Sequence, residues 1–180
     1  MKVAIVGATG AVGREMLRDL EGSKLKDVEL RCFASARSAG TKVTFRSKTH
    51  EVEAFAVEAL KGIPYVLMSA GGGFSREFSK ALVAQGSTVI DNSSAFRMDD
   101  SVALIVPEVN GKTLKTDKPQ IIANPNCSTI QMVVALKPLH EQFGLEMVHV
   151  STYQSVSGTG QKGIAELAAD RKSTRLNSSH

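Results

Sequence analysis

The sequence predicts an α/β protein in which a parallel β-sheet with crossover helices is followed by the start of a second, α+β domain. Through the first half of the chain, short apolar runs alternate with helical patterns, and this alternation is typical of a parallel sheet. From residue 127 onward the pattern changes to one long helical segment and one alternating stretch. We therefore expect a first domain over residues 1–126 and a truncated second one over 127–169.

The predicted strands are apolar runs bounded by turn residues. They are Lys2–Val6, Val28–Ala34, Tyr65–Met68, Thr88–Asp91, Leu104–Val106 and Gln120–Ala123. Thr41–Glu53 is interpreted as a hairpin or a pair of short strands. Met147–Val156 alternates apolar and polar side chains, which predicts a half-buried strand of the second domain.

The predicted helices carry apolar residues at the spacing of one helical face. They span Ala11–Leu20, Val57–Lys61, Ser75–Gln85 and Ser128–Phe143. Pro138 lies inside the last of these, and because proline cannot donate the helical hydrogen bond we expect a kink or break there.

Composition excludes several classes of protein. The chain has 180 residues, of which 42% are hydrophobic and 22% charged, with a formal charge of +4 spread along the sequence. The sequence has no basic stripe of the kind that indicates nucleic-acid binding, and none of its apolar runs reaches the ~20 residues of a membrane span. The apolar N-terminus is too short for a signal peptide, so the cytoplasm is the expected compartment. Cys32 and Cys127 stand far apart and outside any metal-binding spacing, so we expect no metal and no disulfide.

A glycine-rich loop follows the first strand and opens the first helix, with the sequence GATGAVG at Gly7–Gly13. Glycines at these places allow a tight turn, a close approach of backbone to a pyrophosphate and close helix–strand packing, while the helix N-terminus faces the anion. The loop thus predicts a Rossmann-type dinucleotide-binding domain. A glycine turn without ligand is the alternative. The candidate cofactor-binding residues are Gly7, Thr9, Gly10, Ala11, Val12 and Gly13.

The end of the second strand indicates which dinucleotide binds. An NAD site usually has an acidic residue there to hold the ribose 2′-hydroxyl, whereas this chain has Ser35, Arg37 and Ser38 and no acid. A guanidinium and two hydroxyls suit a 2′-phosphate, so NADP is predicted. The alternative is that Arg37 is a solvated loop charge.

Cys127 is the candidate nucleophile. Asn126 can cap the helix that follows, which places the thiol in the first turn, where the positive end of the helix favours the thiolate. A thiolate beside a nicotinamide indicates attack on an aldehyde, hydride transfer and a thioester. A buried structural cysteine is the alternative, and it is the role expected for Cys32.

Six motifs in order resemble the aspartate-semialdehyde dehydrogenase family. They are GATGAVG, SAGGGFS at Ser69–Ser75, DNSSAFR at Asp91–Arg97, VPEVN at Val106–Asn110, NPNCST at Asn124–Thr129 and YQSVSGTGQKG at Tyr153–Gly163. The resemblance extends from Met1 to about Ala169. It implies a homodimer or homotetramer that reduces aspartyl phosphate with NADPH to aspartate semialdehyde and phosphate. That product feeds lysine (through diaminopimelate), methionine and threonine synthesis.

The resemblance also implies site residues. Cys127 matches the nucleophile, and Gln154 the glutamine that orients the substrate. Arg97, with Asn92 nearby, matches the arginine that binds phosphate; an ion pair with an adjacent aspartate is its alternative. The residues implied to lie at the cofactor are Ser69, Ala70, Gly71, Gly72, Ser157 and Gly158.

The sequence departs from the family near its end. The family's general base is a histidine of the second domain, and an arginine and a lysine there help to hold the substrate; none has a match here, since His140 and His149 fit neither motif. We therefore expect the 180-residue chain to be inactive alone, although it could bind NADP. Residues 170–180 are polar and resemble the translation of a sequencing-library adapter, so they are expected to be a non-native tail.

Two rival interpretations remain. N-acetyl-glutamyl-phosphate reductase has the same architecture and a cysteine nucleophile, but differs around that cysteine. A nucleotide-binding protein without catalysis is the other, and an intact, capped Cys127 argues against it.

Overall fold

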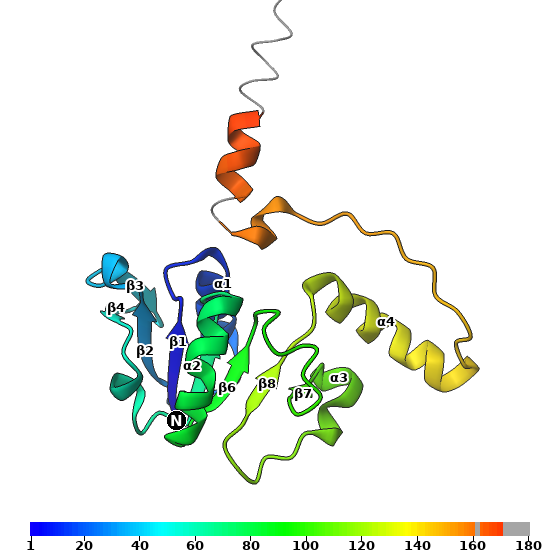
Figure 1. Cartoon of the computed structure of the whole chain (residues 1–180), viewed down its shortest axis with the longest axis horizontal. Helices are drawn as coiled ribbons and strands as arrows, with labels where there is room; N and C mark the ends of the chain where they lie inside the picture. Colours follow the sequence, from blue (N-terminus) through cyan, green and yellow to red (C-terminus); the bar gives the residue numbers. More distant parts are fainter. Residues whose placement is uncertain (161–162, 171–180) are drawn as a thin grey trace, which may run out of the picture.

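The computed structural model describes residues 1–160 and 163–170. Gln161, Lys162 and residues 171–180, which hold nearly all of the expected tail, lie outside the described residues. One eight-stranded sheet organises the described chain, with helices on both of its faces (Figure 1). The predicted α/β class is confirmed.

The sheet has the strand order β3-β4-β2-β1-β5-β6-β8-β7. Every neighbouring pair is parallel except the β3–β4 hairpin, which lies at one edge. The parallel strands therefore end at one common edge, where ligands of open α/β sheets bind. The strands are β1 (Lys2–Val6), β2 (Glu29–Ala34), β3 (Lys42–Phe45), β4 (Lys48–Ala54), β5 (Tyr65–Met68), β6 (Thr88–Asp91), β7 (Ala103–Leu104) and β8 (Ile121–Ala123).

The core lies on both faces of β1, whose alternate residues point in opposite directions. Val3 and Ile5 pack in one cluster with Leu17 of α1 (Ala11–Gly22). Ala4 and Val6 pack in another with Leu82 of α2 (Gly72–Ala84). The two helices thus cover opposite faces of the sheet, which explains why β1 is apolar at every position from Val3 to Val6.

The remaining helices are short, apart from α4. They are the 3-10 helices η1 (Ala36–Ser38), η2 (Val57–Leu60), η3 (Gly111–Thr113) and η4 (Val156–Thr159), and the α-helices α3 (Pro107–Asn110) and α4 (Cys127–Phe143). Residues 163–170 are also helical. α2 begins three residues before the predicted Ser75, so the last glycines of the SAGGG segment form its first turn.

One expectation for the second domain is wrong, and another is wrong in part. Residues 144–155 form neither helix nor strand and are exposed, so the predicted strand Met147–Val156 is absent. An alternating segment becomes a strand only where another strand accepts its backbone hydrogen bonds, and no described strand lies beside this one. α4 also continues through Pro138, so of the kink or break expected there, the break does not occur.

The chain after α4 turns back toward the sheet. From the far end of α4 the extended segment runs over the carboxyl edge, so that η4 lies near the loop between β1 and α1 (Figure 1). Gly158 of the YQSVSGTGQKG motif therefore lies at the edge where the parallel strands end.

Candidate active site

The β1–α1 loop is held against its neighbours by two glycines. Gly7 has a φ of +89°, and a Cβ there would lie 2.5 Å from the Ser69 carbonyl oxygen. A Cβ on Gly13 would lie 2.2 Å from the Gly7 carbonyl oxygen. Both positions thus require glycine for packing, as predicted from the sequence. Gly10 is the N-cap of α1 and makes no side-chain capping bond, so backbone N–H groups of the first turn stay available to a ligand.

A cleft of about 510 Å³ opens above this loop, within the ~300–1,000 Å³ of small-molecule sites. It is formed by the loops after β1, β5 and β6, by the residue before α4, and by the η4 segment. Its walls are Gly10, Ala11, Val12, Ser69, Ala70, Gly71, Gly72, Asn92, Ser93, Ser94, Arg97, Asn126, Gly158, Thr159 and Gly160. Segments up to about 150 residues apart in sequence therefore meet in one cleft.

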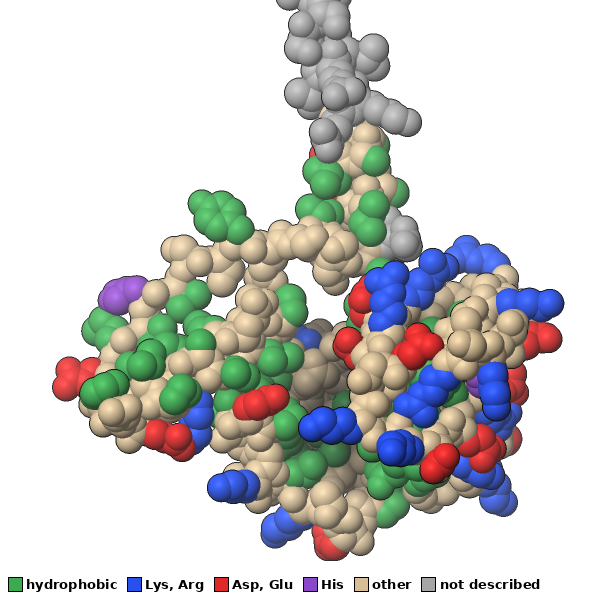
Figure 2. Space-filling model, turned by 180° about the vertical axis from the view of Figure 1, so that it is seen from behind, with side chains coloured by type: hydrophobic (Ala, Val, Ile, Leu, Met, Phe, Trp, Pro, Cys, Tyr) green, Lys and Arg blue, Asp and Glu red, His purple; other side chains and the backbone are tan. Residues whose placement is uncertain are grey.

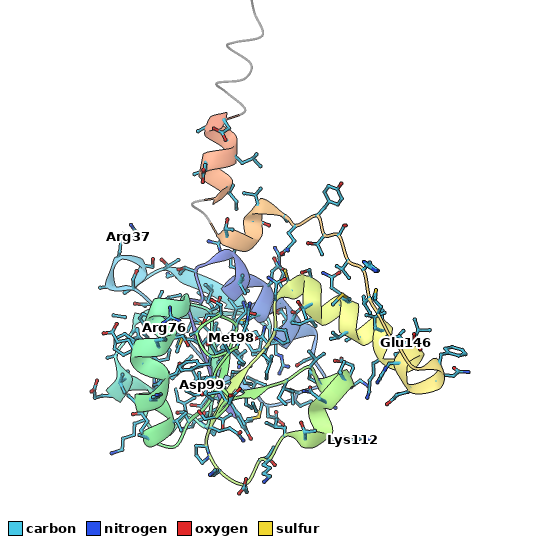
Figure 3. All side chains as sticks on the ribbon, turned by 45° about the vertical axis from the view of Figure 1, so that its right-hand side comes forward. Arg37, Arg76, Met98, Asp99, Lys112 and Glu146 are labelled. Atoms are coloured by element: carbon cyan, nitrogen blue, oxygen red, sulfur yellow. The ribbon has the colours of Figure 1, made fainter. Side chains whose placement is uncertain are left out.

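Seven of the predicted cofactor residues lie outside this cleft wall, and one of them, Ser157, lines the adjoining groove described below. Gly7 and Gly13 pack the loop internally, and Thr9 lines a separate groove beside Arg14. Ser35, Arg37 and Ser38 lie at the end of β2 and in η1, away from the cleft. Arg37 projects outward from that loop and makes no ion pair among the described residues (Figure 3).

Cys127 begins α4, and its thiol is exposed. The Asn126 side chain accepts a hydrogen bond from the Ser128 backbone N–H at 3.0 Å, which confirms the predicted cap. The Cys127 sulfur lies 3.9 Å from Oε1 of Gln154, so the extended segment brings Gln154 to the thiol. Cys127 and Gln154, the two side chains to which the family resemblance assigns roles in the reaction, are therefore adjacent.

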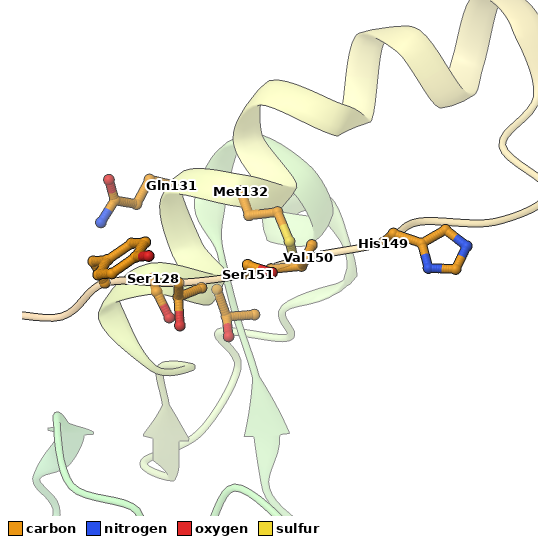
Figure 4. Close-up of a pocket in the computed structure, with 9 residues that line it drawn as sticks. Ser128, Gln131, Met132, His149, Val150 and Ser151 are labelled. Carbon is orange, nitrogen blue, oxygen red and sulfur yellow. The ribbon is translucent and has the colours of Figure 1, made fainter.

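A groove of about 760 Å³ contains both of these side chains and also Ser157. It shares Asn126, Gly158 and Thr159 with the first cleft, so the two spaces adjoin. A ligand bound over the glycine loop can thus extend toward the sulfur. A further pocket adjoins this groove and shares Ser128, Gln131 and Tyr153 with it. There Ser128 and Met132 of α4 face Val150 and Ser151 of the extended segment (Figure 4).

Arg97 and Asn92 lie together at the end of β6. Arg97 donates from Nε to the Asn124 carbonyl at 2.8 Å and from Nη2 to the Asn92 carbonyl at 3.2 Å. It makes no ion pair with Asp99 or Asp100, and Asp99 instead accepts hydrogen bonds from Ser101. The surface ion pair considered for Arg97 is therefore absent from the described part of the chain, and its charge stays within the cleft wall.

Cys32 has the opposite environment. It is 1% exposed in β2, and burial raises the pKa of its thiol to about 11. A thiol that is buried and protonated at neutral pH is a packing group, as the sequence predicted.

Some cleft residues were not singled out from the sequence. Ser93 and Ser94 stand within the DNSSAFR motif, and their place after a strand end was the signal that could have identified them. Thr159 and Gly160 reach the cleft only because the segment after α4 folds back. No local pattern predicts that course.

No described helix is long and apolar enough to cross a membrane. Among the described residues no group of three or more metal-binding side chains occurs.

Family models, curated relatives and solved structures all match this chain to the same family. A model of the semialdehyde dehydrogenase NAD-binding domain matches residues 2–117, and one of the semialdehyde dehydrogenase dimerisation domain matches residues 136–180. Aspartate-semialdehyde dehydrogenases of Aquifex aeolicus and Bacillus subtilis are 52% and 50% identical to the chain over 95% and 93% of its length. These alignments cover 51% and 48% of the two relatives, so the chain spans about half the length of the curated relatives it matches.

Solved structures agree. The crystal structure of aspartate semialdehyde dehydrogenase II from Vibrio cholerae, complexed with ASA, has a TM-score of 0.84 and 45% identity. The alignment covers 93% of this chain and 50% of that one. The enzyme from Candida albicans with NADP has a TM-score of 0.65 and 28% identity, over 80% and 48% of the two chains. The chain therefore belongs to the semialdehyde dehydrogenase family, and its resemblance to the aspartate-semialdehyde dehydrogenases is confirmed.

Proposed function

We propose that this chain supplies the NADP-binding domain and the nucleophile of an aspartate-semialdehyde dehydrogenase of its relatives' full length. The observation that carries the proposal is the junction of the two spaces: the glycine-loop cleft and the Cys127 groove share wall residues. Bound NADPH would supply a hydride there. The substrates would be aspartyl phosphate in one direction and aspartate semialdehyde with phosphate in the other.

The chemistry assigned to Cys127 balances. The thiolate adds to the carbonyl carbon of aspartyl phosphate, the carbon–oxygen bond to phosphate breaks, and phosphate leaves with that electron pair. This step leaves a thioester on the sulfur. Addition of hydride to the thioester carbon, followed by cleavage of the carbon–sulfur bond, releases the aldehyde and restores the thiolate. Gln154, 3.9 Å from the sulfur, is suited to orient the acyl group.

NADP is the proposed form of the dinucleotide. The β2 end carries no acid for a ribose 2′-hydroxyl, and Arg37 stands there without a carboxylate partner among the described residues. A 2′-phosphate would give that guanidinium a bidentate partner. The Candida albicans relative, whose structure was solved with NADP, supports this choice.

The coenzyme proposal is tested by calorimetry on the 180-residue chain with NADP and NAD. We expect Arg37→Ala to weaken NADP binding by about tenfold or more, the effect of losing one charge-assisted pair. NAD binding should be unchanged. Lys112→Ala removes an exposed charge far from the cleft and is the control (Figure 3). An equal loss of affinity for NADP and NAD in Arg37→Ala would contradict the proposal that Arg37 binds the 2′-phosphate.

The activity is tested in a full-length protein that carries this sequence. Such a protein should reduce NADP with aspartate semialdehyde and phosphate, and Cys127→Ser should abolish turnover. Turnover of N-acetylglutamate semialdehyde alone would favour the rival reductase instead. We propose that the 180-residue chain itself binds NADP without turnover, because the general base and further substrate-binding groups are expected elsewhere in a full-length relative.

The finer organisation is also proposed. The domain boundary between residues 126 and 127 coincides with the cap of α4. The match to a dimerisation domain supports self-association of the full-length protein, as a dimer or tetramer. The non-native character of residues 170–180 and a cytoplasmic location stay predictions, and reading the coding DNA tests the first.

A further inference from the structure

The ends of β6 and β8 are tied together through Asn124, the residue directly after β8. Its backbone N–H donates to the Asp91 carbonyl at 3.2 Å. Its side-chain Nδ2 donates to Oδ1 of Asn92 at 2.9 Å. Its carbonyl accepts from Nε of Arg97 at 2.8 Å. One residue is thus bonded to the last residue of β6 and to two residues of the cleft wall, Asn92 and Arg97.

Asn124 itself is not part of that wall, whereas Asn92 and Arg97 are. Its contribution to ligand binding must therefore pass through its neighbours. The side-chain bond fixes the direction of the Asn92 amide. Because the Asn92 oxygen is engaged by Asn124, its NH₂ group is the part of the amide left for a ligand, and it can only donate.

The bond to Arg97 has a different consequence. The guanidinium has five N–H donors, and its two hydrogen bonds use one on Nε and one on Nη2, both with neutral carbonyl oxygens. No carboxylate among the described residues lies within ion-pair distance of it. The carbonyls therefore fix the position of the guanidinium and leave its charge and three donors for an anion.

We propose that Asn124 is a positioning residue that prepares an anion site at the end of β6. Its amide turns the Asn92 NH₂ toward the cleft, and its carbonyl orients Arg97 beside it. This inference rests on the proposed function, in which the anion is inorganic phosphate or the phosphoryl group of the substrate. The prepared donors are neutral and cationic, and both kinds suit phosphate oxygens.

The first test replaces Asn124 by aspartate, which has the same shape and keeps the carbonyl that orients Arg97. A carboxylate cannot donate to Oδ1 of Asn92, so the Asn92 amide should turn over and present its oxygen to the cleft. The new charge also competes for Arg97. We expect the dissociation constant of inorganic phosphate, measured by ³¹P NMR on the 180-residue chain, to rise by about tenfold or more.

Asn110→Asp is the matched control. The Asn110 amide also bridges backbone groups, accepting from Val106 N–H at 2.8 Å and donating to the Leu104 carbonyl at 2.9 Å, but it lies outside the cleft. This variant should lose stability to a similar extent and bind phosphate normally. In the full-length protein, Asn124→Asp should raise the KM for phosphate while the KM for NADP stays unchanged, which general damage to the fold would not do.

Asn124→Ala keeps the test decisive if the aspartate variant does not fold, and it permits a double-mutant cycle. It should weaken phosphate binding in the native background. In an Asn92→Ala background it should add less than about twofold, because its side chain acts through Asn92.

The outcomes separate the positioning role from the proposed function. If a full-length protein with this sequence neither binds nor uses phosphate, both fail. If it binds phosphate and the Asn124 variants bind it equally well, or if the two alanine substitutions add in full, the positioning role alone is overturned.

Discussion

Cys32 and Cys127 carry the same functional group in opposite surroundings, and the difference is set by where each lies in its element. Cys32 is in the middle of β2, with helices and strands around it, and is 1% exposed. Cys127 is the first residue of α4, where the chain leaves the sheet, and it is exposed in the groove that adjoins the glycine-loop cleft. Exposure at a helix start is the environment in which a thiol can act as a nucleophile.

We therefore expect selective alkylation of the native chain. Iodoacetamide at neutral pH should modify Cys127, whereas Cys32 should react only after unfolding. Peptide mapping by mass spectrometry measures both sites. Saturating NADP should slow the reaction, because the cleft and the groove share walls. Equal modification of the two cysteines in the folded chain would refute the assignment of Cys127 as the accessible nucleophile.

The raised pKa of Cys32 predicts a loss of stability in alkali. Burial raises the pKa from 9.0 to about 11, so the unfolded chain loses its proton first as the pH rises. The stabilising contribution of the neutral thiol is thus complete below pH 9 and is lost between pH 9 and about 11. Urea unfolding across this range should show a falling free energy of unfolding. Cys32→Ala should be less stable at every pH but should show a flatter decline, and an identical decline would exclude Cys32 as its source.

At the scale of elements, the sheet could be predicted from the sequence because its strands are buried on both faces. Strands such as β1, β5 and β6 begin and end where the apolar runs do. The segment 147–156 could not be predicted in the same way, since alternation describes a face and does not supply the neighbouring strand. Its residues need a partner for their backbone groups, and the described chain offers none.

Some residues of the candidate site could be predicted from local sequence, and others depend on contacts between distant segments. Gly7, Gly13, Cys127 and its cap follow from local rules of turns and helix starts, so local sequence was enough to find them. The role of Asn124 depends on a contact with Asn92, which is 32 residues away in sequence. Such a contact exists only after β6 and β8 have paired, and no spacing rule contains it.

The contact between α1 and β1 yields a prediction about Gly13. Gly13→Ala would place a methyl group 2.2 Å from the Gly7 carbonyl oxygen, a backbone atom, so the helix must move away from the strand. We expect a loss of about 1–3 kcal/mol in the free energy of unfolding and weaker binding of NADP. Urea unfolding and calorimetry measure the two effects.

Gly22→Ala, in the last turn of the same helix, is the matched control. Nothing lies within 4 Å of a Cβ at Gly22, so this change should leave stability unchanged or raise it by up to about 1 kcal/mol. If both alanine variants behave alike, close packing at Gly13 is not what holds the glycine loop in place.

At the scale of the whole molecule, apolar side chains gather on one part of the surface. Figure 2 shows hydrophobic groups concentrated over α4 and the extended segment, whereas charged groups are spread over the sheet domain. α4 has no buried residue although half of its side chains are apolar. Exposed apolar surface of this extent is typical of a face that packs against another part of the protein or against another copy of it. The family match to a dimerisation domain begins within this helix, at residue 136.

We expect the 180-residue chain to associate with itself through this surface. Phe143 and Met147 are each 73% exposed, so the double substitution Phe143→Ser with Met147→Ser should shift the weight-average mass toward the monomer in sedimentation velocity experiments. Met98→Ser is the control, because Met98 is 95% exposed on the sheet domain and stands apart from α4 (Figure 3). Removing a methionine there should not change the mass. The double variant should dissociate more than Met98→Ser because its two side chains are neighbours. Neighbouring exposed side chains bury area together in a contact, whereas an isolated one buries little. A chain that is monomeric before substitution, or a Met98→Ser variant that dissociates as completely as the double variant, would show that α4 and the segment after it are not the associating face.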